Sequence, residues 1–208
     1  ALGTPVVSGN VSLYNESAER MIFPTPVVGM VGLMDDATRA VGAAFRNEGD
    51  IVLLAGSGEP QLDASEYLGR AEGAPDPPDA DAEVALCRFL ATAARQGLLA
   101  SAHDVSAGGL AVALSEAAMG AGQGVIVAAP VAERDDLALF GEGGARVLVS
   151  CAPGQLDGLN AIAGDVPLMQ LGTVGGSQIT IATNGEPVSV TLADAIEAYE
   201  TAIPRALA

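Results

Sequence analysis

The stretch that decides the fold of this chain is Gly49-Asp50-Ile51-Val52-Leu53-Leu54-Ala55-Gly56. Its first two residues are a turn signal, and a continuous apolar run follows them. Because apolar and polar residues do not alternate along the run, we predict a strand that is buried on both faces. Such a strand belongs inside a sheet that other elements cover.

Three later segments carry helical patterns. A helix is predicted over 81–95, where acidic residues near the start and an Arg near the end suit the helix dipole. Its apolar stripe is predicted to be Val84, Cys87, Ala91 and Ala94. Residues 106–119 are apolar nearly all round and predict a buried helix. The last helix is predicted from Leu192, after Thr191 and Asp194 at capping-box spacing. Its apolar stripe is predicted to be Ile196, Tyr199 and Ile203.

Further strands are predicted from short apolar runs, at 4–7, 27–34 and 146–151. Residues 171–174 and 178–181 flank Gly175-Gly176-Ser177, which is a hairpin signal. The acidic, proline-rich residues 71–80 predict an exposed loop. Helices and strands are mixed without strict alternation, so we predict an α+β fold in which helices cover a mixed sheet.

The composition excludes several classes of partner. The chain has 208 residues, half of them hydrophobic, and a formal net charge of -17. An acidic surface repels phosphate backbones and anionic lipid, so we expect no nucleic acid and no membrane as a partner. A nucleotide held with a metal ion stays compatible, because magnesium and backbone N–H groups act locally. No apolar stretch approaches the ~20 residues of a membrane helix.

The two cysteines, Cys87 and Cys151, lie far apart and form no CxxC motif. This is no disulfide framework, and it fits a reducing cytoplasm. We expect both to be small buried hydrophobes.

The first candidate site is Gly9-Asn10-Val11-Ser12, directly after the predicted strand at 4–7. Gly9 lets a backbone N–H approach a phosphate closely, because it has no Cβ. The side-chain oxygen of Asn10 is a hard ligand that suits magnesium, and the Ser12 hydroxyl points to the same side of an extended chain. The alternative is a strand-ending turn in which both side chains bond their own backbone, and the residues alone favour it.

The second candidate spans residues 103–110, where a strand end or loop leads into the predicted buried helix. Free N–H groups beside two glycines predict an anion cradle at the helix start, and Asp104 offers a metal ligand. The alternative is ordinary capping by Ser106 or Asp104, with His103, the single histidine, as a satisfied and partly buried residue.

Two further segments carry weaker signals. Ser65, Glu66 and Tyr67 either line a cleft or cap a short helix, and capping is favoured. Residues 139–146 contain a Gly-rich turn before a strand. The chain has no Walker lysine motif, no GxGxxG that opens a helix after a strand, and no Ser-His-Asp, Cys-His or HExxH arrangement.

Together these segments resemble a known family. Residues 5–16 (PVVSGNVSLYNE) and 24–32 (PTPVVGMVG) resemble the second half of phosphoribosylformylglycinamidine synthase. So do SEYL at 65–68, HDVSAGGL at 103–110 and the Leu-Phe…Glu…Arg pattern at 139–146, in the same order. The first run is specific for this enzyme. The later ones are shared with aminoimidazole ribonucleotide synthase, selenophosphate synthetase, thiamine monophosphate kinase and a hydrogenase maturation factor.

The resemblance implies an enzyme that uses ATP to phosphorylate the amide oxygen of formylglycinamide ribonucleotide. Ammonia, delivered from glutamine by a glutaminase subunit, then displaces the phosphate to give the amidine; a small bridging subunit is a further implied partner. Family chains are duplicated, with an N-type and a C-type domain in each half. Residues 1–45 are then the end of the second N-type domain. Residues 46–208 are the second C-type domain, a three-layer α/β/α unit.

The resemblance also implies roles for single residues. By motif, Gly9 contacts ATP, Asn10 binds magnesium and Ser12 contacts the substrate. Asp104 matches a position that lies in a metal-binding motif in the other half of the family's duplicated chain.

The chain departs from the family pattern at several positions. Family members often have Asp in place of Ala107, and serines in place of Gly141, Gly143 and Gly144, so fewer hydroxyls can donate to a phosphate here. No catalytic residue is assigned, because the family's catalytic histidine lies upstream and His103 does not match it.

We therefore expect an enzyme fragment. The chain starts with Ala, directly before an apolar run, so we expect it to begin inside a larger polypeptide whose N-terminal half is its partner. Without that half we expect no synthase activity. One alternative is a structural half that docks the glutaminase while the chemistry runs elsewhere. Another is a related synthase such as aminoimidazole ribonucleotide synthase, against which the run at 9–15 argues.

Overall fold

The computed structural model describes residues 1–11, 16–18, 20–21, 25–69 and 73–207. The chain divides into two compact units, Ala1–Thr38 and Arg39–Ala208. Among the described residues, no helix combines the length and the apolar character that crossing a bilayer requires.

Nearly all regular structure lies in the larger unit. Its strands are β1 (Ile51–Ala55), β2 (Ser101–Asp104), β3 (Val125–Ala128), β4 (Val147–Cys151), β5 (Leu168–Val174), β6 (Gln178–Ala182) and β7 (Val188–Thr191). Its α-helices are α1 (Ala80–Arg95), α2 (Gly109–Ala121), α3 (Asp135–Phe140), α4 (Leu156–Ile162) and α5 (Leu192–Leu207). Two 3-10 helices, η1 (Ala37–Arg39) and η2 (Pro153–Gln155), complete the described elements.

The strands form one mixed sheet in the order β2-β4-β1-β5-β3-β6-β7. β1 pairs antiparallel with β4 on one side and with β5 on the other, and its residues from Val52 to Ala55 are buried. The prediction of a strand buried on both faces is therefore confirmed. β3 and β6 run parallel, while the other pairs are antiparallel.

The predicted hairpin between β5 and β6 is wrong. The two strands flank Gly175-Gly176-Ser177, as expected, but β3 lies between them in the sheet. β3 pairs with β5 through Val125 and Val174, and with β6 through Val125 and Ile179. A glycine turn sets the local reversal of the chain, but it does not decide which strand fills the space between its two arms.

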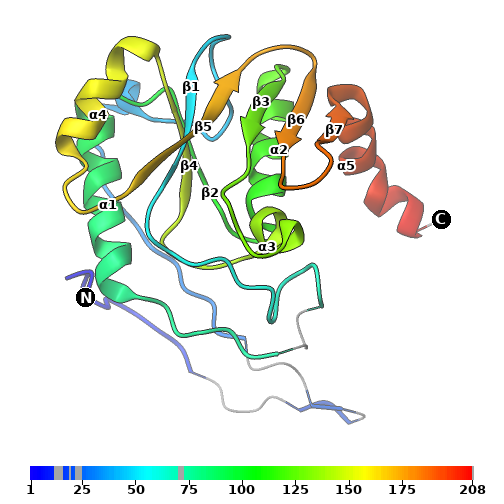
Figure 1. The fold of residues 1–208 in the computed structure, drawn as a ribbon. Helices are drawn as coiled ribbons and strands as arrows, with labels where there is room; N and C mark the ends of the chain where they lie inside the picture. The colour runs from blue at the N-terminus through cyan, green and yellow to red at the C-terminus, as the bar shows by residue number, and fades with distance from the viewer. Residues whose placement is uncertain (12–15, 19, 22–24, 70–72, 208) are drawn as a thin grey trace. The chain divides into compact units, whose positions relative to one another are not determined.

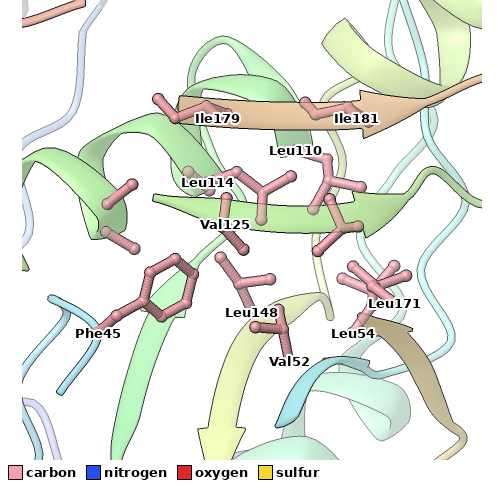
Figure 2. Packing of buried hydrophobic residues seen from close by; sticks show 14 of the residues in the cluster. Phe45, Val52, Leu54, Leu110, Leu114, Val125, Leu148, Leu171, Ile179 and Ile181 are labelled. Atoms are coloured by element: carbon pink, nitrogen blue, oxygen red, sulfur yellow. The ribbon is translucent and has the colours of Figure 1, made fainter. Parts of the chain in front are cut away.

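Helices cover both faces of the sheet, which gives two hydrophobic clusters (Figure 1). On one face, α2 packs Leu110 and Leu114 against strand residues such as Val125 and Leu148 (Figure 2). On the other face, α1 and α4 cover Leu53 and neighbouring strand residues. This arrangement confirms the predicted α+β class and its three layers.

The helix α1 forms where predicted, but its buried face is different. Asp79 caps the helix by accepting from the N–H groups of Asp81 and Ala82, both at 3.0 Å. The buried residues are Leu86, Phe89 and Ala93, so the predicted stripe through Val84, Cys87, Ala91 and Ala94 is wrong. The larger Leu and Phe side chains remove more apolar area from water and therefore set the orientation. As a result Cys87 is exposed, contrary to prediction, while Cys151 is buried as expected.

The two remaining predicted helices are present. α2 is buried along most of its length, but it starts at Gly109 and not at Ser106. The capping box of α5 is confirmed: Asp194 N–H donates to Thr191 Oγ1 at 3.1 Å, and that hydroxyl donates to Asp194 Oδ2 at 2.7 Å. Along the predicted apolar stripe of α5, Ile196 is half-buried, while Tyr199 and Ile203 are 68% and 71% exposed. Leu192 and Ala195 pack against the core instead.

The smaller unit has no strand among its described residues, so the predicted strands at 4–7 and 27–34 are wrong. Val7 and Val28 are about nine-tenths exposed. An apolar run forms a strand only where another strand supplies the missing hydrogen bonds and a core covers its side chains. Within the described part of this unit, the single pairing is the isolated bridge between Glu16 and Met21.

Candidate ligand-binding site

Three of the four segments singled out in the sequence meet at one place in the larger unit. They are residues 62–68, 103–110 and 139–146. The backbones of Gln61 and Glu142 exchange two hydrogen bonds, of 2.6 and 2.7 Å. The rings of Tyr67 and Phe140 stack with centroids 5.1 Å apart and planes 2° from parallel. The fold thus assembles segments that are far apart in the sequence.

The centre of this assembly is the side chain of Glu142. Its Oε1 accepts hydrogen bonds from the backbone N–H groups of Glu66 and Gly108, both at 2.8 Å. Gly108 is the N-cap of α2, has a φ of +81°, and offers no side chain to cap the helix. The carboxylate therefore supplies the negative charge that the start of a helix favours.

The predicted anion cradle at the start of α2 is consequently occupied by the protein itself. The predicted alternative, a cap from Ser106 or Asp104, is also wrong, because no side chain caps α2 from within its own N-terminal segment. Sequence reasoning missed Glu142 as the capping group. The Leu-Phe…Glu…Arg pattern contained the signal, but nothing local to it indicates contact with Gly108.

A second carboxylate holds the Gly-rich turn in the same way. Glu83 of α1 accepts a hydrogen bond from the backbone N–H of Ala145 at 2.6 Å. Ala145 has a φ of +51°, which is uncommon for a residue with a Cβ. The backbone N–H groups of Ala145 and Gly108 are therefore already bonded, to Glu83 and Glu142, and are not free to donate to a phosphate oxygen.

Two hollows flank Glu142. One, of about 390 Å³, is lined by residues that include Asp104, Ser106 and Glu83. The other, of about 480 Å³, is lined by residues that include the four carboxylates of Glu59, Asp63, Asp76 and Asp79. These carboxylates make the region electronegative, so it favours cationic or metal-bound groups and repels a free phosphate.

Asp104 lies at the end of β2 with 76% of its side chain exposed. Within the described ranges, no group of three His, Cys, Asp or Glu residues is arranged to hold a metal ion. A metal at Asp104 therefore needs ligands beyond those residues, and its role as a ligand stays a prediction.

His103 is a partly buried structural residue, as the capping alternative predicted. Its side chain is 14% exposed, and Nε2 lies 3.1 Å from Glu116 Oε2 on α2. Nδ1 lies 2.7 Å from the carbonyl oxygen of Asp104. Nε2 thus links β2 to α2, while the contact of Nδ1 lies within β2.

Ser65 stabilises a turn and caps no helix, because residues 63–68 form turns and the predicted short helix is wrong. It is fully buried, and its hydroxyl donates to the carbonyl oxygen of Leu62 and accepts from the N–H of Leu68 at 3.3 Å.

The remaining predicted site residues lie in the smaller unit. Gly9 and Asn10 are exposed and outside regular structure. Ser12 lies outside the described residues. Their predicted roles toward ATP, magnesium and substrate stay predictions.

The family is settled by a match over most of the larger unit. A family model described as AIR synthase related protein, C-terminal domain, matches residues 47–183. The chain belongs to this family. The AIR synthase related family is the superfamily to which the later motifs pointed, and the segments that meet around Glu142 fall within the matched residues.

The sequence is also similar to individual curated proteins. The chain is 41% identical over 223 aligned residues to the phosphoribosylformylglycinamidine synthase subunit PurL of Anaeromyxobacter sp. (strain Fw109-5). This alignment covers 100% of the present chain and 29% of the relative. It is 44% identical over 215 aligned residues to the subunit of the same name from Synechococcus sp. (strain JA-3-3Ab), covering 97% and 28%. The chain thus spans less than a third of these relatives.

Solved structures share the fold. Thermotoga maritima PurL complexed with FGAR superposes with a TM-score of 0.65 at 20% identity, covering 76% of this chain and 30% of that one. The hydrogenase maturation protein HypE in complex with ATP superposes with a TM-score of 0.55 at 17% identity, covering 74% and 54%. At these identities the likeness concerns the fold alone.

Proposed function

We propose that this chain is the C-terminal part of a phosphoribosylformylglycinamidine synthase of de novo purine biosynthesis. The observation that carries the proposal is the 41% identity to a PurL subunit over the whole chain. The complete enzyme, an ATP-dependent carbon–nitrogen ligase of the cytoplasm, converts formylglycinamide ribonucleotide, ATP and glutamine-derived ammonia to formylglycinamidine ribonucleotide, ADP and phosphate. The chain alone is inactive, because most of the site lies upstream of it.

In this proposal residues 1–45 complete an N-type domain and residues 46–208 are a C-type domain. The exposed apolar side chains of the smaller unit, such as Val7 and Val28, support the first assignment, because they need partner strands to be buried. Within that domain Gly9 contacts ATP, Asn10 binds magnesium and Ser12 contacts the substrate. Asp104 is a further magnesium ligand.

The partners in this proposal are the preceding half of the same polypeptide, a glutaminase subunit and a small bridging subunit. A solved relative described as PurLQS from Thermotoga maritima supports an assembly of more than one subunit. ATP as a cofactor is supported by the T. maritima PurL structures in complex with ATP and with ADP.

The test is ADP release that depends on formylglycinamide ribonucleotide and ammonia, measured on the whole synthase that contains this chain. Asn10→Ala is expected to lower the rate by about tenfold or more, because it removes a metal ligand. Asn160→Ala, an exposed position on α4, is the matched control and is expected to keep full activity. A wild-type synthase without turnover contradicts the proposed function.

A second candidate function is a structural half that completes the enzyme and docks the glutaminase. The observation that favours it is that Glu83 and Glu142 occupy N–H groups of the Gly-rich turn and of α2. If the wild type is active and Asn10→Ala keeps full activity, the chain has the structural role, and the proposed role of Asn10 as a magnesium ligand is wrong.

A further inference from the structure

The larger unit contains a buried cation whose charge has no role assigned in the site described above. Arg146, directly before β4, is only 6% exposed. Arg146 precedes β4 by one residue, and it lines both the hollow of about 390 Å³ described above and a second cavity.

The guanidinium of Arg146 is incompletely bonded. One terminal nitrogen donates to the carbonyl oxygen of Gly141 at 2.7 Å. Nε is buried and has no hydrogen-bond partner among the described residues. Gly58 packs over the side chain so closely that a Cβ there would lie 3.2 Å from Arg146 Cγ. The position of the cation is thus fixed by its surroundings.

Arg146 forms no ion pair with any described residue. Burial lowers the pKa of Arg146, and the more distant charge of Glu59 raises it only in part. A buried cation without a partner is costly, so proteins usually pair it with an anion.

Arg146 lines a cavity of about 560 Å³ between the loop after β1 and the segment around α3. Most of the wall is apolar, from residues that include Leu54, Pro60, Pro130, Leu137, Ala138 and Met169. Two further charged residues in the wall are Glu59 and Glu133. The cavity therefore combines one buried cation, an apolar body and two carboxylates.

We propose that this cavity binds a small organic monocarboxylate with an apolar body, whose carboxylate pairs with Arg146. The pairing supplies the missing counter-ion, and arginine suits a carboxylate because its planar fork matches the two oxygens. A dianionic phosphate is disfavoured, because Glu59 and Glu133 repel a second negative charge. The proposal does not depend on the synthase assignment, since neither Arg146 nor a wall residue of this cavity has a proposed role toward ATP, magnesium or the substrate of the synthase.

The test uses benzoate as the probe and its neutral isostere benzamide as the control, with inorganic phosphate as a third ligand. Binding to the 208-residue chain is followed by amide chemical shifts in its ¹⁵N-resolved spectrum. Benzoate is expected to bind at least about tenfold more tightly than benzamide or phosphate. Pairing one charge with Arg146 is expected to change the affinity by about this factor. The shifts are expected at Gly58, Ala132 and Ala138.

Variants make the result decisive. Arg146→Met is expected to lose the preference for benzoate while keeping weak binding of both ligands. Where that variant does not fold, Glu133→Gln serves instead: it removes an exposed charge from the wall and is expected to tighten benzoate binding by about twofold. Glu186→Gln, also exposed and outside the cavity wall, is the control for net charge and is expected to change nothing. Equal affinity for benzoate and benzamide, or shifts confined to another region, overturns the proposal.

Discussion

Replacing Glu142 by Gln tests the central contact of the candidate site. Glu142 Oε1 accepts from two backbone N–H groups, those of Glu66 and Gly108, each at 2.8 Å. The amide oxygen of Gln keeps the shape but loses the charge. Charge-assisted hydrogen bonds are about twice as strong as neutral ones, so each of the two bonds weakens by about 1 kcal/mol.

The loss of charge also removes a favourable interaction with the start of α2, worth about 0.3–1 kcal/mol. Both contacts are partly open to water, which reduces the total. We therefore expect Glu142→Gln to lower the free energy of unfolding by about 2 kcal/mol. In a chain of this size that corresponds to a fall in Tm of about 4–8 °C.

The assay is urea and thermal unfolding of the chain, followed by far-UV circular dichroism. Glu200→Gln is the matched control, because it removes the same charge from an exposed position on α5. It is expected to change the free energy of unfolding by less than about 0.5 kcal/mol. If the two variants unfold alike, Glu142 does not cap α2 in solution and the reasoning fails.

Three further predictions concern particular contacts. The buried hydroxyls of Ser101 and Ser150 lie 2.6 Å apart, so either Ser→Ala variant is expected to cost about 1–3 kcal/mol in urea unfolding, and the double variant no more than one single variant. Burial raises the pKa of the Cys151 thiol, so a thiol reagent is expected to modify exposed Cys87 in the folded chain and Cys151 only after unfolding. Thr191→Ala is expected to cost about 1 kcal/mol in thermal unfolding, and an unchanged Tm contradicts the capping box.

Features that depend on neighbouring residues followed from the sequence alone. The apolar run from Ile51 to Ala55 predicted a strand covered on both faces, and β1 lies at an interior position of the sheet. The Thr191–Asp194 box marked the start of α5, because its donors and acceptors are three residues apart. The motifs at 103–110 and 139–146 indicated the family for the same reason, since each is a short run of residue types.

Features that depend on distant residues needed the tertiary structure. β3 separates β5 from β6, since strand order reflects which apolar faces fit together across the whole sheet. Along Ala-rich α1, small side chains made several stripes plausible, and packing of Leu86 and Phe89 chose among them. The cap of α2 comes from Glu142, 34 residues away, because a carboxylate can satisfy any N–H group that the fold brings within reach. The sequence by itself thus determined the family and those elements whose signals are local, while only the folded chain decided strand order, buried faces and which charges meet.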